Sequence, residues 1–284
     1  MASLQDRSGT DRHVTDLETN GFTVIPNALT PDEVAVTLSA VKELIASEET
    51  IAKRTGSQSP NLAAVHVVHS KHPKLYEFFL NSPVLEVVHR MIGEDCLLYD
   101  ANVRVPMPSG DRNKRQGFQN HVDREDYSVV PFVSGTHYPM AMNVTWTLVD
   151  FTIENGATLL WPGSHLSCQI PEAESFPPGF VYAEAPAGTA VIWDAAMWHA
   201  SGINKSSSPR YAILAYYQRS WMRGKTDSQR FFPPEVRPKL SQAAQRLYGF
   251  QSGVPDYSEV KALSAEQLAG LTLEEKRVLG FAIY

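Results

Sequence analysis

Hydrophobic and polar residues follow a helical period near the start of the chain. From residue 31 onward, apolar side chains recur every three or four positions along one face, at Val34, Leu38, Val41 and Ile45. Thr30, Pro31 and Glu33 stand at the start of this stripe and match a capping box with proline at the first helical position. The pattern predicts an amphipathic helix that packs against a larger element, most simply a sheet.

Between residues 95 and 222 the period changes to two. In PMAMNVTWTLVDF every second residue is apolar, which is typical of a half-buried strand: Met140, Met142, Val144, Trp146 and Leu148. Four more segments are rich in β-forming residues: CLLYDANVRVPMP, ATLLWPGSH, GTAVIWDA and RYAILAYYQRSW. Turn-forming stretches such as ENG and SGINKSSSP separate them. This region is therefore predicted to be all-β, with many short antiparallel strands.

The flanking segments lack this alternation. Residues 1–16 are polar and unpatterned, and we expect a loose N-terminus there. Residues 17–94 form a mainly helical flank, in which a second helix over about 73–92 is interrupted at NSP. Residues 223–284 return to helical patterns that end near glycine. The order of elements predicts a single α+β domain over 1–284, whose β-rich body is a sandwich or jelly roll.

Composition narrows the class of protein. Of the 284 residues, 43% are hydrophobic and 20% are charged, as in ordinary folded domains, and the net charge is -6. This charge argues against attraction to nucleic acid or to anionic membranes. The N-terminus has no signal-peptide pattern and no stretch of about 18 apolar residues occurs, so we expect a cytoplasmic protein. Cys96 and Cys168 are too few for a disulfide framework and have no metal-ligand spacing.

Candidate chemistry begins with the stretch GFQNHVDRED, where His121 and Asp123 stand two positions apart. On a strand such residues share one face with Cα atoms roughly 6.6 Å apart, so an imidazole and a carboxylate can converge on one ion. On a helix the two side chains would diverge. The pair alone is a weak signal, and a histidine in a solvated loop is the alternative interpretation.

A third ligand is needed for a mononuclear iron(II) centre, which uses two histidines and one carboxylate on one face. His199, in the segment after TAVIWD, can supply it, although it can also simply pack beside Trp198. Arg210 opens the apolar run YAILAYY, where a guanidinium is costly to bury without an anion. A dicarboxylate co-substrate would be such an anion, and an arginine that reaches water at the mouth of the strand is the alternative.

Several segments together resemble the phytanoyl-CoA dioxygenase family of iron(II)- and 2-oxoglutarate-dependent oxygenases. They are GFTVIPNALTPDEV, HVD, ENGATLLWPGSH and WHASGINKSSSPR, and the similarity runs from about residue 17 to residue 222. The resemblance implies a double-stranded β-helix, which is a jelly roll whose wide mouth holds the metal. It also implies Fe(II), 2-oxoglutarate and O2 as cofactor and co-substrates, with succinate and CO2 released.

The resemblance also assigns residues to roles. It makes three side chains the iron ligands: His121, Asp123 and His199. Arg210, eleven residues after His199, would bind the distal carboxylate of 2-oxoglutarate, with support from Ser201. Thr158 matches a hydroxyl that contacts the co-substrate near the metal. His165, in the PGSH turn, matches a residue that shapes the loop and does not ligate iron.

The sequence departs from the family pattern at one position. Many relatives have a glutamine three residues before the first ligand histidine, whereas this chain has Phe118 there and Gln119 next to it. Either Gln119 replaces that contact to 2-oxoglutarate, or the contact is lost. Related halogenases lack the carboxylate ligand, whereas Asp123 is present here. Hydroxylation or a related oxidation is therefore favoured over halogenation.

The substrate is expected to lie under DREDYSVVPFVSGTHYPMAMN, a segment that leaves the metal strand and can fold over the mouth. Five substrate contacts are predicted in this segment and the strand that follows: Tyr127, Phe132, His137, Asn143 and Trp146. The stretch LSQAAQRLYGF is similar to tails of family members that oxidise specialised metabolites, which favours a small, mostly apolar or polycyclic substrate. The C-terminal helices could also bury apolar faces against a second copy and form a homodimer.

Two other functions fit the same residues. A cupin-type dioxygenase or isomerase would keep the jelly roll and the metal without using 2-oxoglutarate. A metal-free jelly-roll protein would only bind its ligand, and both histidines would be structural. Arg210 separates the first alternative from a 2-oxoglutarate enzyme, because only the latter depends on that guanidinium, and metal content separates the second.

Overall fold

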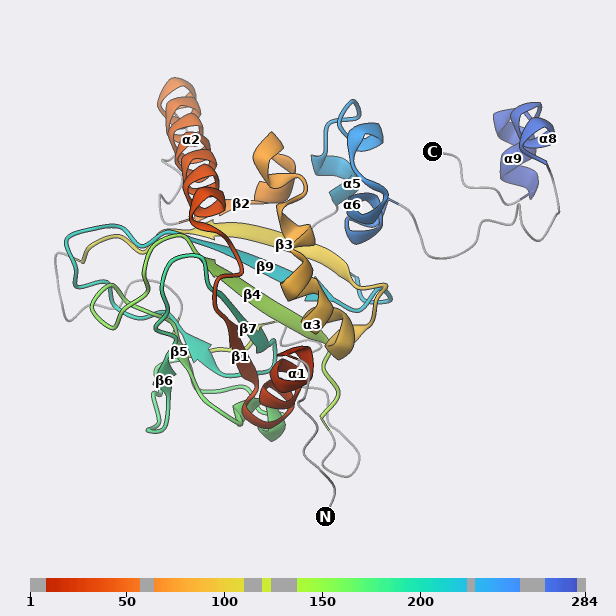
Figure 1. Ribbon diagram of the computed structural model, residues 1–284. Coiled ribbons are helices and arrows are strands. Elements are labelled where there is room, and N and C mark those ends of the chain that lie inside the picture. The colour runs from red at the N-terminus through yellow and green to blue at the C-terminus, as the bar shows by residue number, and fades with distance from the viewer. Residues whose placement is uncertain are drawn as a thin grey trace, which may run out of the picture.

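Two antiparallel sheets form the body of the protein in a computed structural model (Figure 1). The structure describes residues 9–56, 64–109, 119–123, 137–223, 228–250 and 264–279. The larger sheet has the order β1 (Phe22–Ile25), β7 (Ala190–Asp194), β4 (Ala141–Thr147), β9 (Ala212–Gln218), β3 (Leu97–Arg104) and β2 (Ala64–His66). The smaller sheet has the order β6 (Val181–Tyr182), β5 (Leu159–Leu160) and β8 (His199–Ala200). Each of the five β-rich segments predicted from the sequence contains one of these strands.

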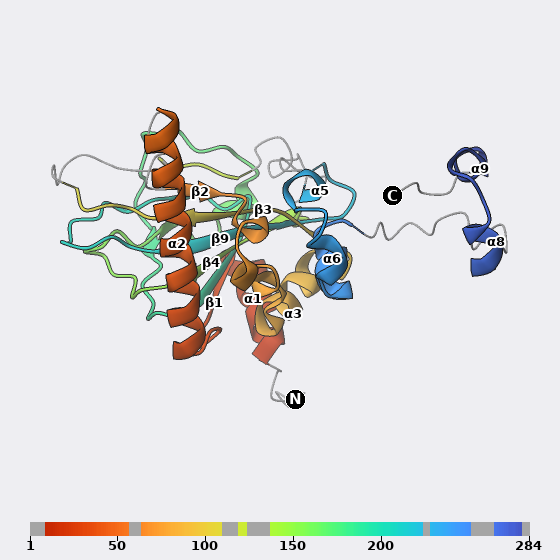
Figure 2. The same ribbon diagram turned by 90° about the horizontal axis from the view of Figure 1, so that it is seen from above.

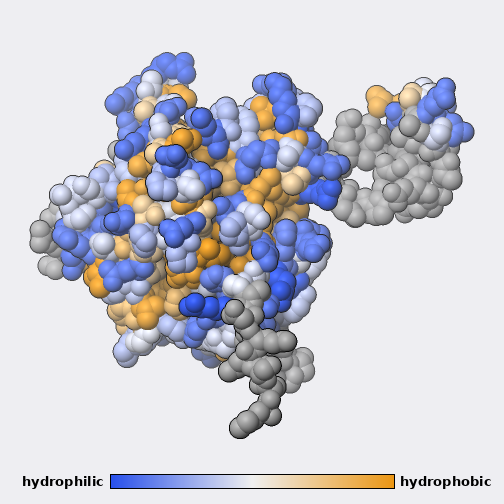
Figure 3. All heavy atoms as spheres, in the orientation of Figure 1, coloured by the Kyte–Doolittle hydropathy of each residue, from blue (hydrophilic) through white to orange (hydrophobic). Residues whose placement is uncertain are grey.

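Helices cover one face of the larger sheet and the smaller sheet covers the other (Figures 1 and 2). The helix side is formed mainly by α1 (Gly9–Asn20), α2 (Pro31–Thr55) and α3 (Ser82–Ile92). There Val41 of α2 and Val88 of α3 belong to one core with Val144 of β4. On the inner face, which looks toward the smaller sheet, Trp193 of β7 packs with Leu160 of β5. Figure 3 shows apolar side chains gathered in the middle of the helix-covered face, between hydrophilic protrusions.

The prediction of a loose N-terminus was wrong for residues 9–16, which belong to α1. This helix packs against β1 and α3, and its Leu17 is buried in the main core. A hydrogen bond of 2.7 Å from Thr10 to Glu86 also connects it to α3. Only Val14 and Leu17 provide apolar packing in α1. This stripe is too sparse to predict a helix, and tertiary contacts stabilise α1 instead.

The predicted capping box at the start of α2 is confirmed. The backbone N–H of Glu33 donates to the Thr30 hydroxyl at 3.3 Å, and the Glu33 carboxylate accepts from the Thr30 backbone N–H at 2.8 Å. The helix ends at Gly56, whose φ of 64° lies in the left-handed region that favours glycine. The predicted apolar stripe packs against the core, as an amphipathic helix on a sheet requires.

The second predicted helix is interrupted at NSP as expected, but only its second half is α-helical. Asn81 caps α3 by accepting a hydrogen bond of 3.3 Å from the Val84 backbone N–H. The Asn81 side chain also donates to the Ala28 carbonyl at 2.8 Å, which fixes the start of the helix against the chain before α2. The preceding chain forms short 3-10 turns: η1 (Val68–Ser70), η2 (Pro73–Leu75) and η3 (Phe78–Leu80).

Strand β4 is buried on both faces, whereas its alternating pattern predicted a half-buried strand. All of its residues are buried. Trp146 lies on the helix side, where its ring packs against Phe78 with centroids 5.1 Å apart. Asn143 and Thr145 point to the inner face, since side chains alternate along a strand. The polar residues of β4 therefore line the space between the two sheets and do not face solvent.

The C-terminal segment is helical as expected, but its helices are short. The best-packed one is α6 (Gln242–Leu247). Its Leu247 and the following Tyr248 are buried in the main core, and Gly249 comes next with a φ of 73°. No helix in the described part of the chain has both the length and the apolar character that a membrane span requires. The other short helices of this segment are α5 (Ser228–Phe231), η5 (Arg237–Lys239), α8 (Ala265–Ala269) and α9 (Leu273–Leu279). One further turn, η4 (Ser164–Ser167), lies between β5 and β6.

A histidine buried in the helix-side core is expected to make stability depend on pH. His69 is fully buried and stacks on Tyr248, and burial lowers its pKa to about 3. Below pH 6.5, the ordinary pKa of histidine, His69 takes up a proton in the unfolded chain but not in the folded protein. The free energy of unfolding therefore decreases as the pH is lowered. We expect a loss of about 2 kcal/mol from this residue at pH 5.

Urea unfolding of the wild-type protein and His69→Phe at pH 7 and pH 5 measures this contribution. The variant is expected to lose about 2 kcal/mol less than the wild-type protein between the two values. Equal pH dependence in both proteins would contradict the assignment.

Candidate metal centre and anion pocket

His121 and His199 lie side by side on neighbouring extended segments. Each backbone N–H donates to the carbonyl of the other residue at 3.0 Å, in an antiparallel bridge. The two ring centroids are 4.1 Å apart. His199 belongs to β8, whereas His121 forms an isolated bridge and not part of a longer strand. The extended conformation expected around His121 is therefore present, and backbone pairing brings together two histidines that are remote in sequence.

Backbone carbonyls fix the tautomer of both histidines. The Nδ1 of His121 lies 2.6 Å from the Gln119 carbonyl, and the Nδ1 of His199 lies 2.9 Å from the Met197 carbonyl. A carbonyl can only accept, so each Nδ1 carries the proton and donates it. Each Nε2 then presents a lone pair. This is the arrangement in which a histidine is oriented to bind a metal.

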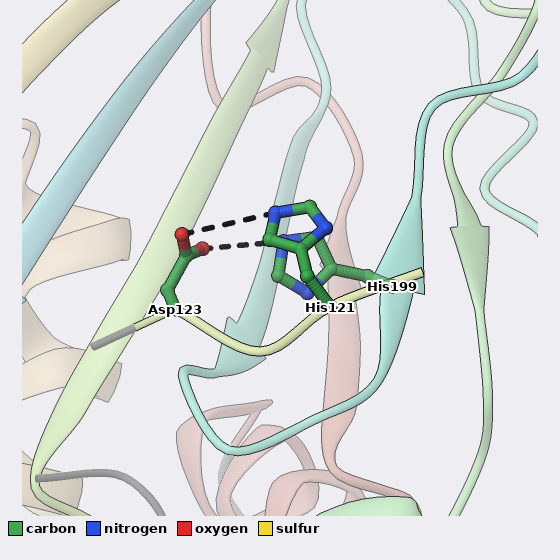
Figure 4. A group of neighbouring side chains, drawn as sticks. All are labelled: His121, Asp123 and His199. Atoms are coloured by element: carbon green, nitrogen blue, oxygen red, sulfur yellow. Dashed lines mark ion pairs between the residues drawn. The ribbon is translucent and has the colours of Figure 1, made fainter. Parts of the chain in front are cut away.

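Asp123 completes the cluster. Its Oδ2 lies 3.2 Å from the Nε2 of His199, and its Oδ1 lies 4.0 Å from the Nε2 of His121 (Figure 4). One ligand atom from each of the three residues can be chosen so that all lie within 4.8 Å of one another. The backbone N–H of Asp123 donates to the Ala195 carbonyl at 2.9 Å, which connects the ligand segment to the turn after β7.

The charges of this cluster favour a bound cation. Burial raises the pKa of Asp123, but His199, His121 and a hydrogen bond from Asn143 outweigh it and keep the pKa below its ordinary value. Burial lowers the pKa of His121 to about 4, so its ring is neutral near pH 7. The Asp123 carboxylate and the Nε2 atoms of both histidines then face one another. Such a set of acceptors is complete only with a cation between them, and two histidines with one carboxylate suit iron(II).

Arg210 provides a buried positive charge on the inner face. Its side chain precedes β9, is only 4% exposed, and lies 4.2 Å above the centroid of the Phe151 ring. Nη1 donates to the Gly156 carbonyl, while Nε has no hydrogen-bond partner among the described residues. Burial lowers the pKa of the guanidinium to about 9, so it is still charged at neutral pH. A buried guanidinium with an unused donor is suited to an anionic ligand.

Two glycines allow the segments around Arg210 to approach closely. A Cβ at Gly202 would lie 2.5 Å from the Ala157 carbonyl oxygen, and one at Gly156 would lie 2.8 Å from the Gly202 carbonyl oxygen. Gly156 also has a φ of 82°. These positions therefore require glycine. The close contact holds the Gly156 carbonyl where Arg210 can reach it.

A family model described as Phytanoyl-CoA dioxygenase (PhyH) matches residues 17–212, a span that contains the three clustered side chains and Arg210. The chain belongs to the phytanoyl-CoA dioxygenase family. The predicted family and the predicted enzyme class, a non-heme iron dioxygenase, are thereby confirmed.

Curated relatives of this phytanoyl-CoA dioxygenase family member come from bacteria and fungi. An uncharacterized protein of Mycobacterium tuberculosis is 26% identical over 254 residues, which cover 88% of this chain and 90% of that protein. Dioxygenase af480 of Aspergillus fumigatus is 29% identical over 237 residues, which cover 81% of this chain and 74% of that protein. The similarity therefore extends over most of the chain.

Solved structures share the fold. EctD from S. alaskensis, crystallised with 2-oxoglutarate and 5-hydroxyectoine, has a TM-score of 0.63 at 21% identity and covers 79% of this chain and 80% of its own. The epimerase SnoN, crystallised with Fe3+, alpha ketoglutarate and nogalamycin RO, has a TM-score of 0.59 at 19% identity and covers 76% of this chain and 85% of its own. The predicted α+β fold with a double-stranded β-helix is confirmed.

The two hydroxyls that the family pattern assigns to the co-substrate lie near the clustered residues. Thr158 immediately precedes β5 and Ser201 immediately follows β8, and both are half-buried. Leu160 and His199 are register partners across these strands. Because residues two positions apart share a face, Thr158 lies on the side of Leu160 and Ser201 on the side of His199. Their contact with 2-oxoglutarate stays a prediction.

Gln119 lies at the surface beside Glu174. Its side-chain amide donates to the Glu174 carboxylate, and the residue is exposed. Its backbone carbonyl is the part that serves the site, because it accepts from His121. The contact of Gln119 with 2-oxoglutarate stays a prediction, and in this structure its amide is hydrogen-bonded at the surface instead.

The five predicted substrate contacts have different outcomes. Tyr127 and Phe132 lie outside the described residues. Trp146 was a wrong prediction, because it is fully buried among the helix-side aromatic rings. Asn143 points to the inner face, where its Nδ2 donates to Asp123 Oδ2 at 2.7 Å. It therefore contacts a candidate metal ligand.

His137 is placed away from the inner face, so its predicted substrate role is also wrong. Its Nε2 lies 2.7 Å from an oxygen of Asp194, and both side chains are buried at the end of β7. Both residues line a cleft of about 380 Å³ together with Leu17 of α1 and Met91 of α3. This cleft is on the helix side of the sheet.

Two aromatic residues of the site were not predicted from the sequence. Trp193 lies 5.3 Å from the ring of His199 and is the register partner of Asn143. Phe151 provides the aromatic face under Arg210. The alternation of AVIWD could have indicated Trp193, because residues 191 and 193 share the inner face. His165 packs against Gly21 and its Nε2 lies 3.3 Å from the Glu18 carbonyl, in agreement with the structural role expected for it.

Proposed function

We propose that this protein is an iron(II)- and 2-oxoglutarate-dependent dioxygenase that hydroxylates an unactivated carbon of a small specialised metabolite. Succinate and CO2 would be the other products. The observation that carries the proposal is the cluster of His121, Asp123 and His199, which each bring one ligand atom within 4.8 Å of the others on the inner face. The family assignment supports the same chemistry.

The three clustered side chains would hold the metal. Two imidazoles and one carboxylate occupy one face of an iron(II) ion and leave the remaining positions for other ligands. Bound iron(II) would supply the activation of dioxygen, which the side chains cannot provide themselves. Backbone carbonyls hold the Nδ1 atoms of His121 and His199, which leaves each Nε2 to face the metal, and Asp123 contributes the negative charge.

Arg210 would bind the distal carboxylate of 2-oxoglutarate. A planar guanidinium presents paired donors to a carboxylate, and a buried site strengthens that attraction. The Nε that has no partner among the described residues supports this role, as does the position of Arg210 on the inner face. Ser201 would support the same carboxylate, and Thr158 would contact the co-substrate nearer the metal. We include both as proposals.

The substrate class rests on the relatives. A fungal relative is named a dioxygenase, and structural neighbours were crystallised with 5-hydroxyectoine or nogalamycin RO, which are small molecules. We therefore propose a small-molecule substrate for this chain, with hydroxylation as the reaction. We also propose that the chain is a single oxygenase domain, that it is cytoplasmic and that it forms a homodimer. The proposal includes no nucleic acid and no membrane as partners.

Succinate release tests this function directly. The purified protein is incubated with Fe(II), 2-oxoglutarate and O2 against a panel of small metabolites, and succinate and oxidised product are quantified together. We expect succinate release to rise with one member of the panel in proportion to product. Product formation that is indifferent to 2-oxoglutarate would favour the cupin-type alternative. A protein that retains no iron after anaerobic loading would favour a binding protein.

A further inference from the structure

We propose that Asn143 is a positioning residue that orients Asp123, so that its carboxylate faces the two histidines at the metal. The inference rests on the proposed function, because it assumes a metal at the clustered residues. Asn143 is only 1% exposed and its Nδ2 donates to Asp123 Oδ2 at 2.7 Å. The sequence suggested a substrate contact at this position, and the geometry points to Asp123 instead.

The orientation of the Asn143 amide follows from its partner. A carboxylate only accepts hydrogen bonds, so the NH2 group of the amide must face Asp123 and the carbonyl oxygen must face away. That carbonyl oxygen is buried and has no hydrogen-bond partner among the described residues. The amide is therefore held in place through Asp123, and the hydrogen bond between the two residues is the one that the structure records for its side chain.

Asn143 lies within a strand that is paired on both sides, whereas Asp123 lies outside the named strands. Asn143 lies in the middle of β4, with Trp193 of β7 and Tyr216 of β9 as its register partners. Asp123 belongs to none of the named strands and is connected to the sheets through its backbone bond to Ala195 and the neighbouring bridge at His121. A carboxylate on such a segment needs a donor on a fixed element to define its rotamer.

The hydrogen bond distinguishes the two carboxylate oxygens. Asn143 uses a lone pair of Oδ2, while Oδ1 accepts no hydrogen bond from it. Oδ2 also lies 3.2 Å from the Nε2 of His199, so the Asn143 donor holds the carboxylate where it faces the histidines. Without the Asn143 donor the carboxylate can rotate away from the histidines. Weaker metal binding and a changed coordination are the expected consequences.

Cobalt(II) is a suitable probe, because its affinity and its visible absorption spectrum report on the ligands without turnover. Two variants remove the donor: Asn143→Leu, which keeps the volume, and Asn143→Ala, which is smaller. Thr145→Val is the matched control for metal binding, because Thr145 is equally buried on the inner face of β4 and has no recorded contact with Asp123. Titration calorimetry gives the dissociation constants, and thermal unfolding of the metal-free proteins shows that each variant is folded.

We expect both Asn143 variants to bind cobalt(II) about 10- to 100-fold more weakly than the wild-type protein, with a changed absorption spectrum. Thr145→Val is expected to match the wild-type protein in both. Loss of the hydrogen bond to Asp123 should weaken binding at least about tenfold. The inference is overturned if a folded Asn143 variant keeps its affinity within about 3-fold and its spectrum unchanged. Absence of cobalt(II) binding by the wild-type protein would instead overturn the proposed function, and this inference with it.

Discussion

Replacing His199 with alanine is expected to abolish stable iron binding and to lower succinate release by about a thousandfold or more, equivalent to about 4 kcal/mol. The substitution removes one of three ligands, and the remaining histidine and carboxylate no longer cap one face of the ion. His199 is also the bridge partner of His121, but that bridge is made by backbone atoms, so alanine preserves it. The loss is therefore expected at the metal and not in the pairing of the strands.

His137→Gln is the matched control for His199→Ala. His137 also faces an aspartate at short distance, in the pair with Asp194, but that pair lies on the helix side of the sheet. We expect the His137 variant to keep its iron content after anaerobic loading, whereas His199→Ala loses it. Iron content and succinate release are measured on the same samples. Full iron retention by His199→Ala would remove this histidine from the metal site.

Replacing Arg210 with methionine is expected to raise the KM for 2-oxoglutarate by about 100-fold or more, because truncating one partner of a buried charge pair costs about 2–5 kcal/mol. Methionine keeps much of the aliphatic volume beside Phe151 but offers no donor to a carboxylate. Iron binding is expected to be unchanged, since Arg210 is not among the clustered ligand residues. A higher KM for 2-oxoglutarate in Arg210→Met, with unchanged iron content, would show that Arg210 binds the co-substrate.

Arg219→Met is the matched control for Arg210→Met. Arg219 also binds backbone carbonyls, at Pro139, Ile92 and Met91, and its guanidinium lies 3.9 Å above the ring centroid of Tyr138. Its substitution is expected to lower stability without changing the KM for 2-oxoglutarate. KM is determined from initial rates of 2-oxoglutarate consumption at saturating iron. A KM for Arg210→Met within about 3-fold of the wild-type value, far below what losing a charged hydrogen bond would cause, would favour the cupin-type alternative.

The residues of the candidate metal site could be predicted because their signals are short in sequence. His121 and Asp123 are two positions apart, so an extended backbone is enough to put them on one face. His199 and Arg210 lie in a motif-rich segment whose resemblance to the family covers both. The structure brings His121, Asp123 and His199 together and buries Arg210 on the inner face. Their convergence required the pairing of β8 with the His121 segment, which no local pattern specifies.

The substrate-side prediction at Trp146 failed because the face of the strand mattered. Asn143 and Trp146 are three positions apart in β4, and strand alternation puts them on opposite faces. The alternation of apolar and polar residues in β4 could not show which face lies toward the smaller sheet, because both faces of this strand are covered. Gln119 and His137 were assigned from their place along the chain. Their actual partners, Glu174 and Asp194, are 55 and 57 positions away in sequence.

The sequence alone determined the periods of the helices and strands, the capped start of α2, and the spacing of the ligand side chains, since each depends on neighbours within a few residues. Only the tertiary structure decided that α1 forms, that Trp146 belongs to the core, and that Asn143 contacts Asp123. These outcomes depend on which strands pair and in which register. A shift of one residue in that register would exchange the two faces of a strand, so no local period can specify them.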